Sequence, residues 1–365
     1  MNGNKYTEKY NELARSILNY MAENNRGENI IVSPLSFILL LGIAADTVQG
    51  KAREEVLRAV GDNMSFEDFL DVLKEIQTDS AKSGSLKSSN AVCIKESISD
   101  SVSEEYVRHL SEVFDGRSFS SSDMVRDVNA WIKEKTNGMI ENVADESMKQ
   151  MLVCLMNAIA FESEWKEKYE ERDVYFNHFH NSDGSLSKVQ MLSSTEKMYI
   201  ADEFFTGFVK PYKDEKYSYM ALLPRKEGNA FLQKTVKQIN FTKLLSEVNN
   251  NKVFVRIPEY RYEYGKDLTG LCHNMGINTL FTTEADFSPL SSESLMMGSI
   301  VYKAHIEVDR KGTNAAVDSM GIVLGDIGSI FNREIVILNR PFVYAIMDTE
   351  TKLPVFTGIY NRANV

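Results

Sequence analysis

The stretch from Gly312 to Phe331, which reads GTNAAVDSMGIVLGDIGSIF, constrains this chain more than any other segment. About twenty residues is long for a connection inside a compact domain, and loops of that length are usually functional or disordered. Its composition does not favour disorder, because Asp318 and Asp326 are its only charged residues and because Val, Ile and Leu favour strands. The pattern alone leaves three possibilities open: a loop with a special task, an ordinary long surface loop, or one more buried strand.

Side chains alternate with a period of two along the first part of this stretch, as they do in a strand. One face carries Thr313, Ala315, Val317, Ser319, Gly321 and Val323. The other face carries Asn314, Ala316, Asp318, Met320, Ile322 and Leu324. Burying an unpaired charge costs several kcal/mol, and the first face has no charge. The loop therefore has a face that is suited to enter a packed interior.

The rest of the chain reads as helices first and strands later, which predicts an α+β architecture with helices packed on large sheets. A short strand is expected at 29–32, and residues 78–89 are expected to form a polar loop. Helical periodicity covers 5–22, 34–45, 51–60, 65–77, 102–114 and 124–136, and shorter helices are expected at 229–236, 240–248 and 266–275. Strand patterns cover 152–161, 188–192, 205–211, 217–223, 252–264, 299–309, 334–338, 342–347 and 354–360. The helix at 34–45 is apolar nearly all round and is predicted to lie inside the protein.

Composition excludes several classes of function. The formal net charge of −11 argues against nucleic acid and anionic membranes as partners. The longest apolar run, Leu35 to Ala45, is too short to span a bilayer. No linker or repeat interrupts the chain, so one domain over residues 1–365 is expected. The N-terminus does not resemble a signal peptide, which predicts a cytoplasmic protein as given, or an extracellular one if a signal was removed.

The sequence offers no catalytic motif: neither G-x-S-x-G, H-E-x-x-H, a Walker loop nor a dinucleotide fingerprint is found. Cys93, Cys154 and Cys272 are far apart and odd in number, so buried free thiols are expected. His178 and His180 would share one face of a strand, but no carboxylate or Cys lies at a supporting spacing. We therefore expect no enzymatic activity, no metal and no cofactor.

Several motifs, in this order along the chain, together resemble the serpin family. They are NIIVSPLS (29–36), NAWIKEKTNGMI (129–140), NAIAFESEW (157–165), VKPY (209–212), YMALLP (219–224), MGINTLF (275–281), ADFS (285–288), RPFVYAI (340–346) and PVFTG (354–358). The resemblance runs from Asn29 to Asn361. It implies a metastable fold of three β-sheets and about nine α-helices, with an exposed reactive-centre loop at about 310–333 that acts as bait for a protease.

The resemblance also implies a mechanism. The nucleophile of the protease attacks the bait and forms an acyl-enzyme, and the cut loop then inserts into the main sheet as a new strand. About fifteen residues at roughly 3.3 Å each would move the protease on the order of 50 Å. The expected partner is a serine protease, with a cysteine protease as a variant target. A non-inhibitory serpin that acts as a carrier, chaperone or storage protein is the alternative.

The hinge of the loop decides whether insertion is possible. It comprises Gly312, Thr313, Asn314, Ala315, Ala316 and Val317. Its small residues fit inhibitory members of the family. Arg310 stands where the family usually has Glu, Asn314 replaces another acid, and Val317 and Asp318 replace Ala-like residues. These departures leave the inhibitory expectation in place, because the inward face keeps no charge.

The family's usual spacing puts the reactive bond between Asp326 and Ile327. An acid before the cut would suit proteases with a basic specificity pocket, such as granzyme-like serine proteases or caspase-like cysteine proteases. Cleavage after Val323 or Leu324 is the alternative, and it would suit elastase-like or chymotrypsin-like enzymes.

Two further regions are implied by the resemblance. Ser33, Ser36 and Asn157 match the shutter, where central strands must part, and Tyr302 replaces the usual histidine there, with a phenol that can still bond to Asn157. Trp165 matches the breach, where insertion starts. The segment 65–77 is acidic where heparin-binding members are basic, so no heparin binding is expected. The chain is also expected to be a monomer.

Overall fold

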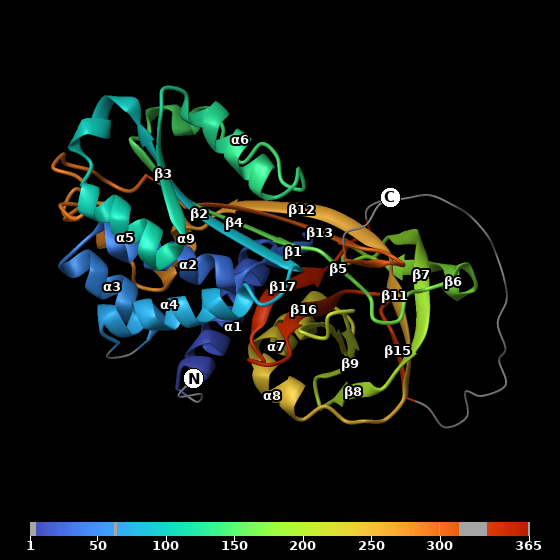
Figure 1. Ribbon diagram of the computed structural model, residues 1–365. Coiled ribbons are helices and arrows are strands. Elements are labelled where there is room, and N and C mark those ends of the chain that lie inside the picture. The colour runs from blue at the N-terminus through green and yellow to red at the C-terminus, as the bar shows by residue number, and fades with distance from the viewer. Residues whose placement is uncertain (1–4, 62–63, 299, 314–333, 364–365) are drawn as a thin grey trace. The chain divides into compact units, whose positions relative to one another are not determined.

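The computed structural model describes residues 5–61, 64–298, 300–313 and 334–363. Its helices are α1 (Lys5–Asn24), α2 (Pro34–Thr47), α3 (Lys51–Val60), α4 (Phe66–Ser80), α5 (Glu104–Phe114), α6 (Met124–Lys135), α7 (Asn229–Gln238), α8 (Phe241–Ser246) and α9 (Thr269–Asn274). Its strands are β1 (Ile30–Val32), β2 (Leu86–Lys95), β3 (Gly116–Ser121), β4 (Val153–Phe161), β5 (Ser163–Glu164), β6 (Val174–His180), β7 (Leu186–Glu196), β8 (Met198–Ala201), β9 (Phe205–Pro211), β10 (Tyr217–Pro224), β11 (Val253–Pro258), β12 (Tyr260–Asp267), β13 (Val301–Val308), β14 (Gly312–Thr313), β15 (Glu334–Ile337), β16 (Phe342–Asp348) and β17 (Pro354–Tyr360). Figure 1 shows this α+β arrangement, which confirms the predicted fold class.

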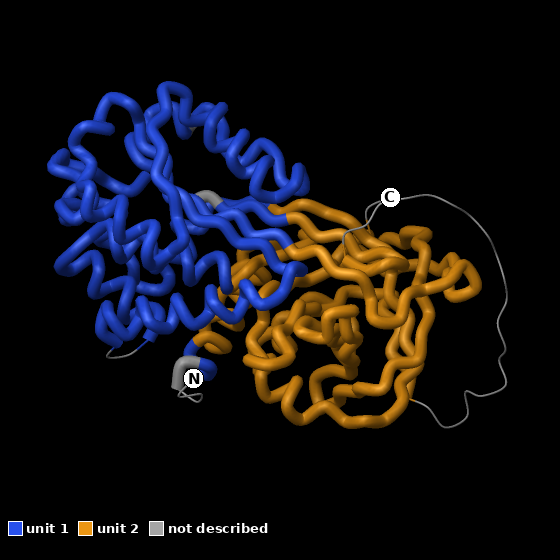
Figure 2. Tube along the Cα trace, in the orientation of Figure 1, with its two compact units in different colours: residues 1–9, 35–160, 265–304 blue, residues 10–34, 161–264, 305–365 orange. Residues whose placement is uncertain are grey.

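The chain divides into two compact units (Figure 2). Unit 1 comprises residues 1–9, 35–160 and 265–304, and unit 2 comprises 10–34, 161–264 and 305–365. The boundary falls inside strands β4, β12 and β13, so these strands contribute residues to both units. The expectation of one domain stays a prediction.

Unit 1 is built mainly of helices whose starting points are encoded locally. Ser65, Ser103 and Asp123 precede α4, α5 and α6, and the side-chain oxygen of each accepts a hydrogen bond from the backbone N–H three residues later. Such caps satisfy a donor that the first turn of a helix leaves free. Helix α2 is buried along its whole length, as its apolar sequence predicts.

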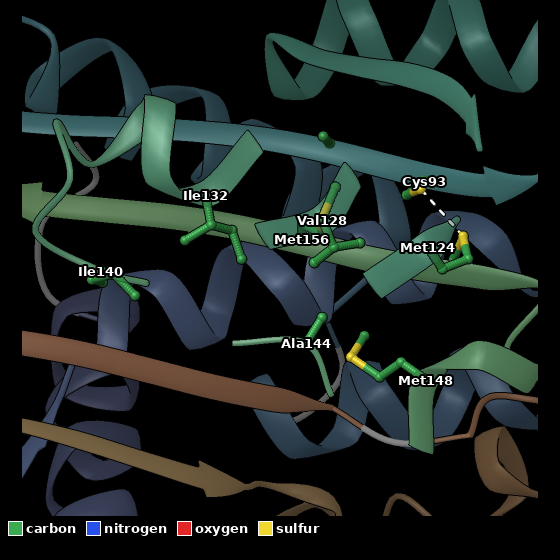
Figure 3. Close-up of a cluster of buried hydrophobic side chains, with 9 residues drawn as sticks. Cys93, Met124, Val128, Ile132, Ile140, Ala144, Met148 and Met156 are labelled. Atoms are coloured by element: carbon green, nitrogen blue, oxygen red, sulfur yellow. Dashed lines mark hydrogen bonds between the residues drawn. The ribbon is translucent and has the colours of Figure 1, made fainter. Parts of the chain in front are cut away.

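The sheet of unit 1 has the strand order β3-β2-β4. Helix α6 packs on it through Met124, Val128 and Ile132, whose side chains meet Ala91 and Cys93 of β2 (Figure 3). The segment 78–89 was expected to be a loop, and that expectation is wrong at 78–80, where α4 continues to Ser80, and from residue 86 onward, where β2 begins. After the buried Leu86, residues 87–89 of β2 are polar and exposed or partly exposed, so their sequence does not resemble a buried strand.

Unit 2 consists mostly of strands. A six-stranded sheet has the order β1-β17-β16-β10-β9-β8, and a four-stranded sheet has the order β15-β11-β7-β6. Every residue of β10, β16 and β17 is buried, which explains why their sequences are largely apolar. The fourth group, β12-β13-β14-β5, carries the site described below.

The described strands form four hydrogen-bonded groups, one more than the three sheets expected. The difference arises because β4 and β5 follow one another along the chain, interrupted only at Glu162, yet belong to different groups. Strand β4 is therefore an edge strand, and no ladder joins it to β13 within the described ranges. Among the described helices, none is long and apolar enough to cross a membrane.

The three cysteines are free thiols, as predicted. Cys93 and Cys272 are fully buried and Cys154 is half-buried. Burial raises the pKa of each thiol to about 12, above the ordinary value of about 8.5 for cysteine. The reactive thiolate form is thus scarce at neutral pH.

We expect the folded chain to resist alkylation by iodoacetamide at pH 8, because each thiol is protonated and because Cys93 and Cys272 are also fully buried. In denaturant all three cysteines should react, and mass spectrometry counts the labels. Rapid labelling of Cys93 or Cys272 in the folded chain at a model-peptide rate would contradict the burial described.

Candidate functional site

Strand β14 lies between β13 and β5 and ends at the last described residue before the long loop. Thr313 pairs with Val308 of β13 on one side and with Ser163 of β5 on the other, and Gly312 pairs with Glu164. Strand β14 is thus already a short central strand. The remaining predicted hinge and reactive-bond residues lie outside the described residues: Asn314, Ala315, Ala316, Val317, Val323, Leu324, Asp326 and Ile327.

A tight hairpin connects β13 to β14. The backbone N–H of Asp309 donates to Gly312 O at 3.0 Å, which leaves Arg310 and Lys311 as a two-residue turn. The Asp309 carboxylate accepts from the backbone N–H groups of Lys311 at 2.7 Å and Gly312 at 2.9 Å. An aspartate that bonds to the backbone two and three residues on is typical of a stable turn.

Gly312 is required by the close approach of β14 to β5. A Cβ atom at this position would lie 2.1 Å from Ser163 O and 2.6 Å from Glu164 Cα. Both neighbours are backbone atoms, which cannot rotate away as the end of a side chain can. The glycine that the sequence assigned to a hinge therefore also allows two strands to pair here.

Thr313 is anchored by a stack of aromatic rings. Its side chain is buried, and its hydroxyl lies 2.7 Å from the hydroxyl of Tyr212. The Tyr212 ring stacks on Trp165, with ring centroids 4.8 Å apart and an interplanar angle of 6°. Burial raises the pKa of Tyr212 well above its usual range, so the phenol keeps its proton. Thr313 therefore faces the interior, as its position on the uncharged face predicts.

Trp165 also holds the hairpin turn directly. Its indole Nε1 donates to Asp309 O at 2.8 Å, and its backbone N–H donates to Lys311 O at 2.8 Å. The side chain is almost fully buried. The residue that the sequence matched to the breach thus contacts both ends of the turn that precedes the loop.

Arg310, which departs from the family's usual glutamate, has an acidic partner. Its Nε lies 3.3 Å from Glu259 Oε1, and a further guanidinium nitrogen donates to Gln190 at 3.2 Å. Both charged side chains are partly exposed, so the pair is worth at most about 1 kcal/mol. The unusual charge is accommodated in the structure without burial of an unpaired cation.

Asn157 faces its neighbouring strand. Its Nδ2 donates to Asn90 Oδ1 at 2.8 Å and to Ser88 Oγ at 3.2 Å, both on β2. Its Oδ1 is buried and accepts no hydrogen bond. The side-chain amide of Asn157 is thus turned toward β2, and the bond to Tyr302 that the sequence allows stays a prediction.

A small cavity of about 40 Å³ lies beside β4 within unit 1. Asn157 and Ala158 of β4, and Tyr302 and Lys303 of β13, line it. Helices α6 and α2 also contribute, and they lie on opposite sides of the sheet in Figure 1. The sheet is thus open next to the unpaired edge of β4, and such an edge can accept another strand.

The two serines matched to the shutter lie in different units. Ser33 Oγ donates to Val355 O at 2.8 Å within unit 2, and Ser36 is buried on α2 in unit 1. Their shared role with Asn157 and Tyr302 stays a prediction. In the part of the chain that is described, no three His, Cys, Asp or Glu side chains are placed to hold a metal ion.

Tyr212 was not singled out from the sequence. It lies in the VKPY motif, but its contacts are with Trp165 and Thr313, both distant along the chain. Periodicity shows that such a residue is buried and cannot show which side chain it meets. Only the family motif offered a signal.

Comparison with known proteins agrees with this architecture. A family model described as Serpin (serine protease inhibitor) matches residues 8–362. The chain is a serpin. Iripin-3 of Ixodes ricinus is 28% identical over an alignment that covers 98% of this chain and 95% of that protein. The native-state crystal structure of Tengpin, a thermophilic serpin, is 30% identical, covers 97% of this chain and 94% of its own, and has a TM-score of 0.85.

Not every structural neighbour is named for protease inhibition. Thyroxine-binding globulin in complex with thyroxine has a TM-score of 0.87 and covers 98% of this chain and 99% of its own, at 17% identity. At that identity the likeness shows the fold alone. Membership of the family therefore does not establish the activity of this chain, which has to be inferred from its own residues.

We expect Gly312→Ala to lower the free energy of unfolding by roughly 1–3 kcal/mol, because the new Cβ would push β14 from β5. The measurement is the midpoint of urea unfolding. Gly84→Ala is the matched control, since no heavy atom lies within 4 Å of its added Cβ. Equal effects of the two substitutions would show that β14 does not pack against β5 as described.

Proposed function

We propose that this serpin is a suicide-substrate inhibitor of serine-type endopeptidases. The protease attacks the loop at 314–333, an acyl-enzyme forms, and the cut loop inserts beside β13 before water can hydrolyse the ester. The observation that carries this proposal is β14, whose two residues already pair with a strand on each side. Insertion would be the extension of an existing ladder, which avoids the cost of starting a new one.

The register of β14 supports this extension. Continuing the pairing of Thr313 with Ser163 one residue at a time brings Val323 opposite Val153, where β4 begins. The residues from Thr313 to Val323 are also those whose alternate positions form the uncharged face. Because Thr313 is buried, the residues that share its face would be buried as well.

The same register bears on the reactive bond, which we propose to be Asp326–Ile327. Asp326 follows Val323 by three residues, so it would lie just past the end of β4 when the ladder is complete. An acylated residue must stay outside the sheet because it carries the protease. Cleavage after Val323 or Leu324 would put the acyl bond at the last ladder position or directly beside it.

An acid before the reactive bond favours proteases with a basic specificity pocket. Granzyme-like serine proteases and caspase-like cysteine proteases both fit this description, and the proposal places serine proteases first. The non-inhibitory alternative, a carrier or storage protein, is supported only by the fold that the chain shares with thyroxine-binding globulin.

We expect a covalent complex, stable in SDS, when the chain is incubated with a serine protease that cuts after aspartate. A panel should also contain a caspase, an elastase and a chymotrypsin. The mass of the released fragment locates the bond, and residues 327–365 are expected. If every protease nicks the loop and none forms a covalent species, the inhibitor proposal fails.

We expect Ala315→Arg to abolish the covalent complex while cleavage of the loop continues, because the guanidinium would have to enter the interior. Asn314→Arg is the matched control, since its side chain would point to the opposite face. The readout is the ratio of complex to cleaved chain on a denaturing gel. Similar behaviour of the two variants would show that the loop does not insert with this alternation.

A further inference from the structure

Unit 2 contains a buried ion pair next to the site. Lys210 on β9 and Glu196 at the end of β7 have side chains that are only 2% and 9% exposed, and Lys210 Nζ lies 2.8 Å from Glu196 Oε1. Desolvation usually cancels the Coulombic gain of such a pair, so stability alone does not explain it. A buried pair of this kind is better explained by what it holds in place.

The Lys210 ammonium is enclosed by two aromatic rings as well as by the carboxylate. Its Nζ lies 4.6 Å from the centroid of the Tyr169 ring and 5.4 Å from that of Trp165. A cation over a ring face is attracted by the ring's quadrupole, and more strongly where water is excluded. The indole of Trp165 therefore contacts Tyr212 and the buried cation at once.

A second path links Glu196 to Tyr169. Ser194 Oγ donates its only proton to Glu196 Oε1 at 2.6 Å, so its contact of 3.2 Å with the Tyr169 hydroxyl must be one in which the tyrosine donates. Burial raises the pKa of Tyr169 well above its usual range, which keeps that donor proton in place. Glu196 thus fixes Lys210 directly and Tyr169 through Ser194.

Both rings belong to residues that hold the turn before β14. The backbone N–H of Tyr169 donates to Arg310 O at 3.0 Å, and that of Trp165 donates to Lys311 O at 2.8 Å. Together with the indole bond to Asp309 O, three consecutive carbonyls of the chain are bound. Lys210 contacts the rings of these two residues, and the ion pair bonds to none of the three carbonyls itself.

We propose that Lys210 is a positioning residue for loop insertion: held by Glu196, its ammonium fixes Trp165 and Tyr169, which keep the turn and β14 in register with β5. The inference rests on the proposed function. If the Lys210 ammonium is lost, the loop is expected to insert more slowly. More of the acyl-enzyme is then hydrolysed before the protease is trapped. The pair therefore tunes the number of inhibitor molecules consumed for each protease trapped.

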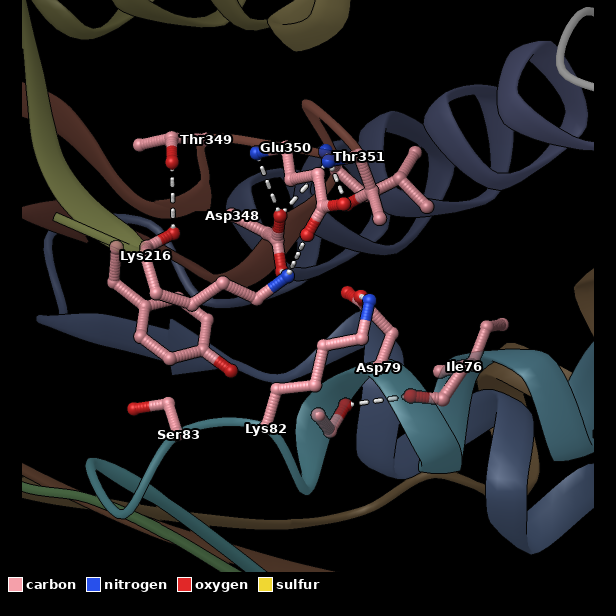
Figure 4. Close-up of polar contacts among 12 residues, drawn as sticks. Ile76, Asp79, Lys82, Ser83, Lys216, Asp348, Thr349, Glu350 and Thr351 are labelled. Carbon is pink, nitrogen blue, oxygen red and sulfur yellow. Dashed lines mark hydrogen bonds and ion pairs between the residues drawn. The ribbon is translucent and has the colours of Figure 1, made fainter. Parts of the chain in front are cut away.

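The test compares three variants with the parent chain. Lys210→Met removes the charge and keeps the length of the side chain. The exchange Lys210→Glu with Glu196→Lys keeps an ion pair but places a carboxylate at the rings. The control is Lys216→Met, which breaks another largely buried pair of unit 2. Lys216, directly before β10, lies 2.8 Å from Asp348 at the end of β16, with side-chain exposures of 12% and 6% (Figure 4).

Two readouts separate positioning from inhibition. The chain has two tryptophans, so a Trp131→Phe background leaves Trp165 as the only indole, and its emission and acrylamide quenching need no protease. The second readout is the stoichiometry of inhibition. We expect Lys210→Met and the exchange to change Trp165 emission and to raise the stoichiometry about five- to thirty-fold, the factor that one or two kcal/mol produces. Lys216→Met should change neither.

Three results would overturn the inference. Lys210→Met could leave both readouts unchanged, the exchange could behave like the parent chain, or Lys216→Met could match Lys210→Met. If the parent chain traps no protease, the proposed function is wrong, and so is the proposed role of Lys210 in loop insertion. Trp165 emission would still report whether the ion pair positions the ring.

Discussion

The stack of Trp165 on Tyr212 is the contact on which the site depends. One ring binds the turn that ends β13, and the other binds the hydroxyl of Thr313, the last described residue before the loop. The stack thus fixes the register of Thr313 and keeps its side chain pointing inward. Every later step of the proposed mechanism uses that starting register, because a shift of one residue would turn the other face of the loop toward the interior.

A second constraint is the unpaired edge of the sheet β3-β2-β4. Strand β4 has an unpaired edge, a small cavity lies beside it, and Asn157 leaves a buried carbonyl oxygen without a partner. Each of these features costs free energy that a fully paired sheet would recover. The chain also carries a segment whose alternation suits that edge. A native state that can gain stability by accepting its own loop is the physical basis of the proposed inhibition.

Much of the fold could be predicted from the sequence, and the failures have physical reasons. Helices with a local cap or a strong apolar stripe were predicted within a few residues, and α2 was predicted to be buried. Strands β3 and β6 were missed because their residues are largely polar or partly exposed, and without a buried face they lack the apolar alternation that marks a strand. All of β2 was missed as well, because residues 87–89 are polar and the short apolar run at 91–94 shows no period-two alternation.

The site also contains residues that could be predicted from the sequence and residues that could not. Gly312, Thr313 and Trp165 could be assigned from family motifs, and the structure brings them together. Tyr212, Lys210 and Glu196 could not be assigned, because their roles come from contacts between strands far apart in sequence. The contacts of Asn157 with Asn90 and Ser88 could not be predicted either, because packing decides which strand its amide meets. The alternation of side chains along the loop, in contrast, can be read from the sequence alone.

The most direct test of the account is the melting temperature of the chain before and after a single nick within residues 314–333. The nick frees the loop to insert but adds no new residue. We expect a large rise in the melting temperature, because new ladder hydrogen bonds form and the open edge is filled. An unchanged or lower melting temperature after complete cleavage would contradict it.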